Sequence, residues 1–143
     1  MNREIKFRGY LKDSYFKGHE EHPSYEPLLN NRIVKIHSIH FNSKKVIISR
    51  PTGGNTSVEF KDIEIMPFTG LYDKNSVPIY EGDIINNKNI WEDVNYEVIY
   101  DKGAFYGKRK NLYFKENVYL KLYKVDKENI EVIGNIYTIK ENR

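Results

Sequence analysis

The sequence predicts a mainly β fold, and three observations support this prediction. Aromatic residues make up 14% of the 143 residues, with 12 Tyr and 7 Phe, and such side chains favour pleated sheets. Good helix formers are scarce, since the chain holds two Met and a single Ala, Ala104. Several segments alternate apolar and polar residues with the period of two that a half-buried strand requires, and Val94–Tyr100 is the clearest of them.

Length and composition bound the class of protein. A chain of this length has the usual size of one domain, and 39% apolar with 30% charged residues is unlike a disordered chain. The absence of Cys excludes disulfides, thiolate zinc sites and a Cys nucleophile, and it suits a reducing cytoplasm. Met1–Glu4 leads directly into a strand pattern and no apolar run reaches membrane-spanning length. We therefore expect a cytoplasmic protein with no membrane partner.

The first half of the chain is expected to hold one strand, a loop and a hairpin. Ile5 and Phe7 alternate with charged residues in Arg3–Tyr10, which predicts the first strand. Residues 13–31 lack periodicity and carry Gly and Pro, which predicts a long irregular loop. Ile33–Phe41 and Val46–Arg50 then form a predicted hairpin, with a bulge near His37-Ser38 because the apolar parity changes there.

The middle of the chain is divided by turn residues. Pro51–Thr56 is the clearest break, and a change of parity predicts a bend at Lys61-Asp62. The chain is expected to reverse at Asp73–Ser76, where the Asp side chain can cap the turn. Asp101–Gly103 is expected to form a three-residue turn between Val94–Tyr100 and a returning strand at Ala104–Lys108.

Two features of the last third are less uniform. Residues 112–125 fit a strand by alternation and a helix by spacing, so a short helix near residues 112–123 stays open, although aromatic and β-branched content favours a strand. Ile130–Tyr137 is the last predicted strand. Gly134 inside it indicates a bulge or a close backbone approach.

Three separated patches resemble the YopX family of small phage and prophage proteins. They are Arg3–Arg8, Phe68–Asn75 continued by Tyr80–Ile85, and Glu131–Tyr137. The resemblance implies a phage origin, homo-oligomers and a compact YopX-like fold, and Tyr80–Ile85 resembles the entry into small SH3-like barrels. We therefore expect such a barrel in the C-terminal half of a domain over residues 1–143, either undivided or as two β lobes, 1–66 and 67–143. Ser76 departs from the family pattern, which has Gly there.

The four His residues raise the possibility of a metal site. His19 and His22 lie in the predicted loop beside acidic residues, whereas His37 and His40 are three apart on a strand and point to opposite faces unless the bulge realigns them. Ordinary polar surface is the favoured interpretation, and we expect neither a metal nor another cofactor. Glu81 with Asp83, and the Gly53-Gly54 pair, are likewise better explained as turns than as catalytic or phosphate-binding groups.

Two stretches interleave basic and aromatic residues, as surfaces that bind single-stranded nucleic acid do. They are Lys6–Tyr10 and Phe105–Tyr113, and the latter contains the cluster Lys108-Arg109-Lys110. The alternative is that the rings face the core while the cations only solvate a hairpin end. The candidate binding residues are Lys6, Arg8, Tyr106, Lys108, Arg109, Lys110 and Tyr113.

Three functions follow from these patterns, in decreasing order of support. The first is a non-catalytic phage or prophage module that binds a host or phage protein, because none of the usual enzyme motifs is present. The second is a nucleic-acid or nucleotide binder that uses residues 105–113. The third is a metal-dependent hydrolase built on His19 and His22. Residues 1–50 carry a net charge of +5 and residues 51–143 a net charge of −2, so the first half is the one expected to attract anions.

Overall fold

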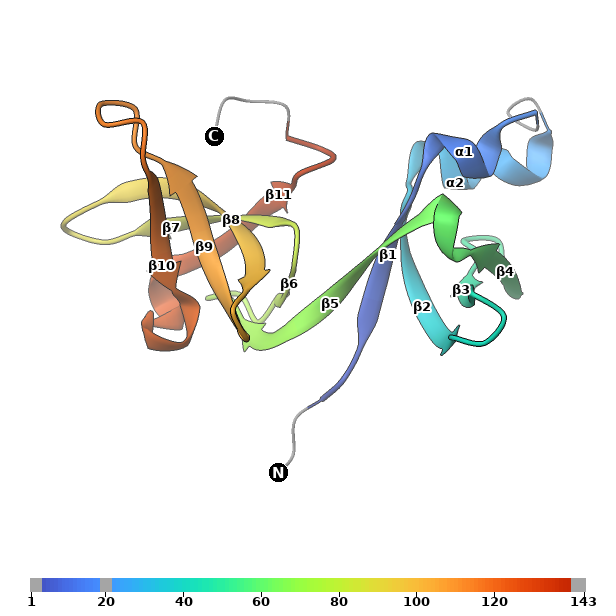
Figure 1. Ribbon diagram of the computed structural model, residues 1–143, viewed down its shortest axis with the longest axis horizontal. Coiled ribbons are helices and arrows are strands. Elements are labelled where there is room, and N and C mark those ends of the chain that lie inside the picture. Colours follow the sequence, from blue (N-terminus) through green and yellow to red (C-terminus); the bar gives the residue numbers. More distant parts are fainter. Residues whose placement is uncertain (1–3, 19–21, 140–143) are drawn as a thin grey trace. The chain divides into compact units, whose positions relative to one another are not determined.

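The computed structural model describes residues 4–18 and 22–139, which divide into two units. One unit comprises Lys6–Pro67, and the other begins at Phe68 and includes the residues before Lys6. The strands of both units are antiparallel (Figure 1). The elements of the first unit are β1 (Phe7–Leu11), α1 (Asp13–Phe16), α2 (Glu26–Asn30), β2 (Ile33–His40), β3 (Lys45–Ser49), β4 (Asn55–Glu59) and the start of β5 (Ile63–Tyr72).

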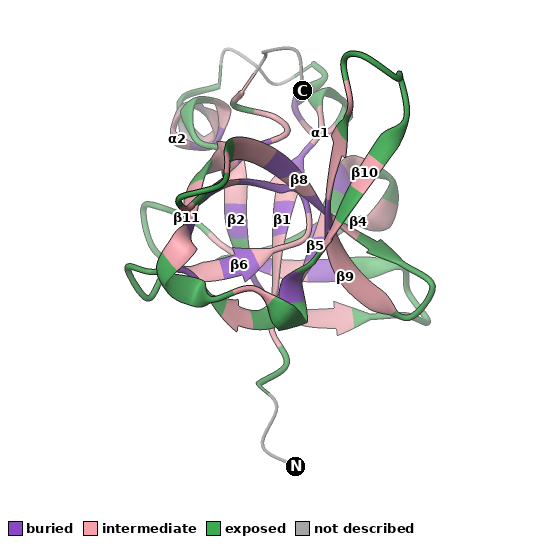
Figure 2. Cartoon of the chain, turned by 90° about the vertical axis from the view of Figure 1, so that its left-hand side faces the viewer, coloured by how far each residue is buried: buried purple, intermediate pink, exposed green. Residues whose placement is uncertain are grey.

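The first unit is a sheet with strand order β4-β3-β2-β1-β5, to which Phe16 of α1 and Leu28 of α2 add buried side chains. Buried positions recur along the strands as purple bands on β1 and β2 in Figure 2. Alternation explains this pattern, because successive strand residues point to opposite faces. The core residues are Leu11, Phe16, Leu28, Val34, Ile36, Val46, Ile48, Val58 and Ile63.

Two predictions for this unit and for the residues just before it were wrong. Residues 13–31 are not one irregular loop, because α1 and α2 lie within them, joined in part by a 3₁₀ turn at Pro23–Tyr25. Pro27 stands in the first turn of α2, where its missing N–H costs nothing, so the proline taken as a breaker starts a helix instead. Ile5 does not bury its side chain, since it is 75% exposed and precedes β1.

Other predictions for the same unit are confirmed. β2 and β3 form the expected hairpin, and their register shifts between Ile36 and Ser38, at the predicted bulge. Gly53 and Gly54 both have positive φ in the β3–β4 connection, a backbone conformation that glycine adopts at no steric cost. The bend expected at Lys61-Asp62 is a 3₁₀ turn, Phe60–Asp62.

The second unit is a five-stranded sheet with order β10-β9-β8-β7-β11. The elements of the second unit are β6 (Pro78–Tyr80), β7 (Asp83–Lys88), β8 (Asp93–Asp101), β9 (Ala104–Lys110), β10 (Asn117–Lys121) and β11 (Ile130–Asn135). The last residues of β5 pair with β6. The core residues are Ile79, Ile85, Tyr96, Val98, Leu122 and Ile130.

The expected SH3-like barrel is not confirmed, because the described strands form an open sheet. β10 and β11 are its two edges. Two 3₁₀ turns, Leu122–Lys124 and Lys127–Asn129, separate these strands along the chain and carry it from one edge to the other. β11 then pairs with β7, so no strand within residues 4–18 and 22–139 closes the sheet on β10.

Local expectations for the second unit are mostly confirmed. Of residues 112–125, Asn117–Lys121 form a strand, preceded by a turn and followed by the 3₁₀ turn Leu122–Lys124, so the strand is shorter than predicted and no α-helix forms among these residues. The register of β11 shifts between Val132 and Gly134, and a Cβ on Gly134 would lie 2.6 Å from Ile139 Cδ1, so this glycine marks both a bulge and a close approach. The turn after β8 was predicted one residue too long. Asp101 pairs with Ala104, and Lys102 and Gly103 both have positive φ, which is the two-residue hairpin geometry.

A buried carboxylate, that of Asp73, fixes the turn after β5. Its Oδ1 accepts the backbone N–H groups of Asn75 at 2.8 Å and Val77 at 2.9 Å, and its Oδ2 accepts the N–H of Val132 at 2.9 Å. Burial by itself would raise the pKa of this carboxyl, but the three backbone hydrogen bonds together outweigh burial and lower its pKa below the ordinary value. Two segments 59 residues apart are therefore joined by one side chain.

Replacing Asp73 by Asn is expected to lower the free energy of unfolding by about 2 kcal/mol. The amide keeps one acceptor oxygen but presents an N–H group to the N–H of Val132, which is left without an acceptor. Urea denaturation followed by circular dichroism, with hydrogen exchange at the Val132 amide, measures the loss of stability. Asp126→Asn is the matched control, because Asp126 caps an exposed turn by accepting the N–H of Glu128, and a change within about 0.5 kcal/mol is expected.

The lowered pKa of Asp73 also predicts a pH dependence of stability. A carboxyl whose folded pKa lies below its unfolded pKa stabilises the fold above the unfolded value, about 3.9, and loses that contribution as pH falls through the folded value. The free energy of unfolding should therefore fall below about pH 4 more steeply in the wild type than in Asp73→Asn. Parallel curves for the two proteins would contradict this role of the carboxylate.

Ser76 adopts φ of 60°, a left-handed conformation that favours Gly, the residue that the resemblance led us to expect here. We expect Ser76→Gly to raise the free energy of unfolding by about 0.5–1 kcal/mol, because Gly enters this region without a Cβ clash. Ser57→Gly is the matched control, since Ser57 is exposed within β4 and Gly should destabilise a strand there. Thermal unfolding of both variants tests the prediction, which a lower stability of Ser76→Gly would contradict.

Candidate binding surface

The hairpin of β9 and β10 has an inner and an outer face. A Cβ on Gly107 would lie 2.9 Å from Tyr96 Cβ, so this position of β9 packs closely onto the core residue of β8. Phe105 also packs against the core of the unit. Because strand side chains alternate, Tyr106, Lys108 and Lys110 point to the opposite, outer face.

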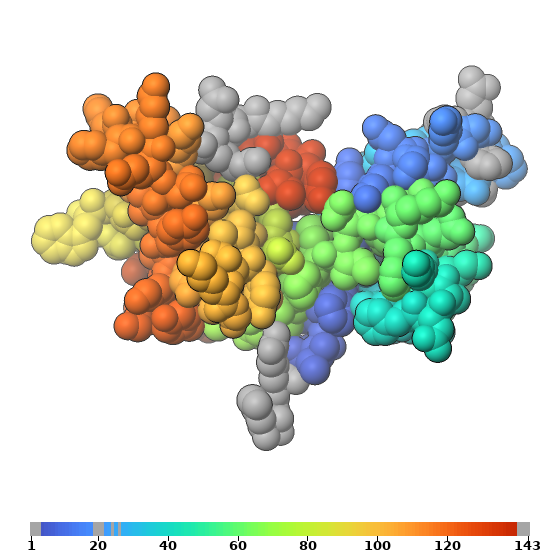
Figure 3. Space-filling view, viewed as in Figure 1, coloured from blue at the N-terminus to red at the C-terminus, as the bar shows by residue number. Residues whose placement is uncertain are grey.

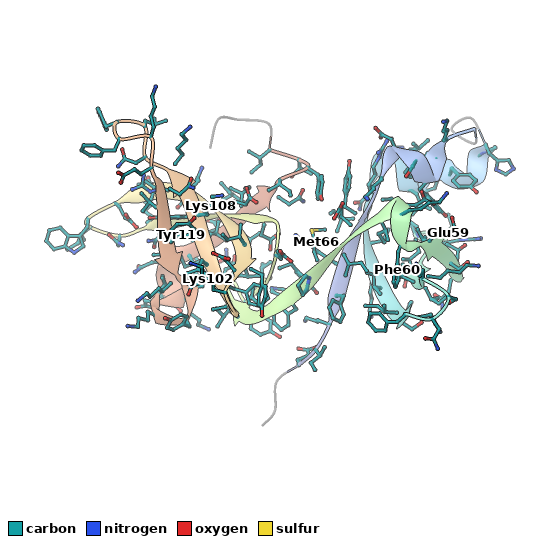
Figure 4. All side chains as sticks on the ribbon, viewed as in Figure 1. Glu59, Phe60, Met66, Lys102, Lys108 and Tyr119 are labelled. Carbon is teal, nitrogen blue, oxygen red and sulfur yellow. The ribbon has the colours of Figure 1, made fainter. Side chains whose placement is uncertain are left out.

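The outer face combines cations with aromatic rings. Tyr119 lies opposite Lys108 and Lys121 lies opposite Tyr106 in the register of the two strands. The rings of Tyr106 and Tyr119 meet edge to face with centroids 6.4 Å apart, and Tyr119 is 50% exposed. Figure 4 shows Lys108 and Tyr119 on these strands. We name this set the β9–β10 face: Tyr106, Lys108, Lys110, Tyr119 and Lys121.

One end of the β9–β10 face is hollowed. An open depression of about 270 Å³ is lined by Asp101, Lys102, Tyr106 and Tyr119. Glu97 of β8 lies opposite Lys108, so the surface is not uniformly positive. Lysines still outnumber carboxylates on it, and the two rings lie between them.

The charge of this region is far from the average of the chain. Residues 102–124 hold seven Lys or Arg and one acidic residue, Glu116, together with six aromatic residues, while the whole chain has a net charge of only +3. The net charges of residues 1–50 and 51–143 do not reveal this basic segment, because acidic residues elsewhere in 51–143 offset its positive charge. Sequence reasoning accordingly missed Lys102, Tyr119 and Lys121, which the strand register would have revealed.

Arg109 does not belong to the β9–β10 face. Its guanidinium lies over the ring of Tyr96, with its central carbon 5.7 Å from the centroid, and the Tyr96 hydroxyl donates to Glu92 Oε1 at 3.3 Å. Burial has the largest effect on the pKa of the Tyr96 hydroxyl and raises it. Arg109 opposes that rise, and Glu92 adds to it. Arg109 therefore covers a buried ring, while its two neighbours in sequence face the opposite side.

The remaining predicted binding residues lie elsewhere. Lys6 and Arg8 belong to the first unit, where Arg8 Nη2 donates to Met66 Sδ at 3.7 Å. Tyr113 lies in the turn between β9 and β10 and is 92% exposed. Of the seven predicted residues, the β9–β10 face thus contains Tyr106, Lys108 and Lys110.

The histidines that could be described have other contacts. His22 packs its ring edge to face on Tyr25, with centroids 6.0 Å apart, and His19 lies outside the described residues. His37 pairs with Ser49, and His40 pairs with Ser38 at 2.9 Å. Among residues 4–18 and 22–139, no three His, Cys, Asp or Glu side chains come together as a metal site would require.

The acidic and glycine-rich turns have structural uses. The carboxylate of Asp83 is buried and accepts the N–H of Tyr80 at 2.8 Å, which closes the turn around Gly82. Gly53 donates its N–H to the carbonyl of Arg50 at 3.1 Å inside the β3–β4 connection. Both segments therefore form turns, which is the interpretation that the sequence favoured for them.

The two faces of β9 predict different effects on stability. Arg109→Gln should lower the free energy of unfolding by about 1 kcal/mol, because a neutral amide replaces the cation that lies over the ring of Tyr96. Lys108→Gln is the matched control one residue away, and a change within about 0.5 kcal/mol is expected for it. Urea denaturation of the two variants measures the difference. A larger effect of Lys108→Gln would contradict the assignment of the faces.

Comparisons with known proteins agree with the sheet architecture. Residues 22–141 match the family described as YopX protein. The structure is similar to the crystal structure of protein EF1440 from Enterococcus faecalis, with a TM-score of 0.52, 22% sequence identity and 94% of each chain covered. The comparison with curated proteins gave no match. No helix in the described part of the chain has the length and apolar character needed to span a membrane.

Proposed function

The chain belongs to the YopX family, and we propose that it is a non-catalytic binding protein of phage or prophage origin. The partner that best fits its surface is single-stranded nucleic acid in the host cytoplasm. The observation that carries this proposal is the β9–β10 face, where the half-buried ring of Tyr106 meets the exposed ring of Tyr119 among lysines.

The chemistry of that face suits a flexible polyanion. Lysine ammonium groups neutralise phosphates and release counterions, while rings stack on bases of any sequence. Lys108, Lys110 and Lys121 come from two neighbouring strands, and Tyr106 and Tyr119 lie between them. The sheet fixes the backbone positions from which these side chains leave, so the order of cations and rings along the face is set before a ligand binds.

A protein partner is the second candidate, and the open sheet edges favour it. β4 and β10 end their sheets and pair on one side with β3 and β9. Unpaired edges are templates for strand addition by another chain, either a host or phage protein or a second copy of this one. The proposal therefore retains homo-oligomers, as the family resemblance implied.

Binding of a fluorescently labelled oligothymidylate, followed by anisotropy, tests the proposal. We expect binding at low salt that weakens steeply as salt rises. The triple variant Lys108→Gln, Lys110→Gln, Lys121→Gln should bind roughly tenfold more weakly or worse. It should also reduce the slope of log affinity against log salt by about 0.7 for each phosphate that is no longer neutralised.

The matched control removes the same charge from the other unit. Lys35, Lys44 and Lys45 are exposed on or beside β2 and β3, and their replacement by Gln should change affinity less than about twofold. An equal effect of both triple variants would show that only net charge matters. Absence of oligonucleotide binding, with a protein captured instead from infected cells, would replace this proposal by the second candidate.

A further inference from the structure

Two turns of the second unit display large apolar side chains to solvent. Ile90 and Trp91 are 89% and 86% exposed between β7 and β8. Leu112, Tyr113 and Phe114 are 80%, 92% and 75% exposed between β9 and β10. We name these turns the β7–β8 tip (residues 89–92) and the β9–β10 tip (residues 111–116). Large apolar groups gathered at protruding tips indicate a surface that a partner covers.

The two tips lie at the same end of the five-stranded sheet. Lys88 pairs with Asp93 at the end of one hairpin and Lys110 pairs with Asn117 at the end of the other, while the intervening β8–β9 turn closes the opposite end. Figure 1 shows the yellow and orange loops leaving the sheet and diverging, and Figure 3 shows both as protrusions. Each tip therefore offers its own small apolar surface.

Both tips are held by the same device, an asparagine that caps the turn. Asn89 Oδ1 accepts the N–H of Trp91 at 2.7 Å and of Glu92 at 3.0 Å. Asn111 Oδ1 accepts the N–H of Tyr113 at 2.9 Å and of Phe114 at 3.1 Å. The capping bonds fix the backbone beneath the exposed rings, so these side chains are presented from a defined turn.

Charge complementarity favours a nucleic-acid strand as the occupant. Lys110 and Lys115 flank the exposed rings of the β9–β10 tip, and the tip continues directly into the lysines of the β9–β10 face. The β7–β8 tip instead carries the carboxylates of Glu92 and Asp93, which accept the side-chain amides of Asn87 and Asn86, so the charge argument rests on the β9–β10 tip. Rings that alternate with cations match the alternation of bases with phosphates.

We propose that Trp91, Tyr113 and Phe114 stack on bases and hold a single strand at the two tips, while the lysines of the β9–β10 face contact its phosphates. This inference rests on the proposed function and adds the residues that would bind bases. Trp91 is the one Trp of the chain, so its fluorescence reports on one tip without any label.

The test titrates the full chain with an oligothymidylate and follows Trp91 emission and anisotropy together. Stacking should quench the emission, with saturation at the same oligonucleotide concentration as the anisotropy. An abasic oligonucleotide of equal length keeps the phosphates and lacks the bases, so it should bind without quenching. Trp91→Leu should weaken oligothymidylate binding about tenfold, since it keeps an apolar side chain but removes the ring.

Ile90→Ala is the matched control, because Ile90 is equally exposed on the same tip and has no ring; affinity should change less than about twofold. Salt-dependent binding with unchanged Trp91 emission and an unaffected Trp91→Leu variant would overturn this inference and leave the proposed function standing. Absence of any oligonucleotide binding would overturn both. A blue shift with phosphatidylglycerol vesicles, without any response to oligonucleotide, would make the tips lipid-inserting and would also overturn both.

Discussion

The second unit depends on one buried carboxylate, that of Asp73. An ionised group without water is costly unless hydrogen bonds replace its hydration, and here three backbone N–H groups do so. Two of the bonds close the turn after β5, and the third, to Val132, holds that turn against β11. The side chain therefore sets both a local conformation and a long-range contact.

The hydrogen bonds of Asp73 also join two of the three patches that resemble the YopX family. Phe68–Asn75 contains Asp73, and Glu131–Tyr137 contains its partner Val132. Backbone bonds reinforce the junction, since Lys74 N–H donates to the carbonyl of Ile130 and Ile136 N–H donates to the carbonyl of Gly82, both at 2.9 Å. The patches of the second unit thus meet in space as scaffold. Candidate binding groups lie outside them, on strands and turns that the scaffold supports.

The separation of scaffold and surface follows from the alternation of strand side chains. Gly107 allows β9 to approach Tyr96, and Arg109 covers that ring from the same side. Lys108, between them in sequence, faces outward beside Tyr119. A run of three cations is consequently divided, with one used in packing and two available to a ligand. Net charge alone would have counted all three alike.

Local patterns by themselves predicted most of the strands, the bulges near Ser38 and Gly134 and the Asp73 cap, because period and turn chemistry act over a few residues. Only the tertiary structure decided the rest. Asp13–Phe16 and Glu26–Asn30 are helices whose Phe16 and Leu28 join the core of the first unit, and the second sheet stays open because β11 pairs with β7. The membership of the binding face depended on the register between β9 and β10. Register is a relation between strands, and the alternation within one strand does not contain it.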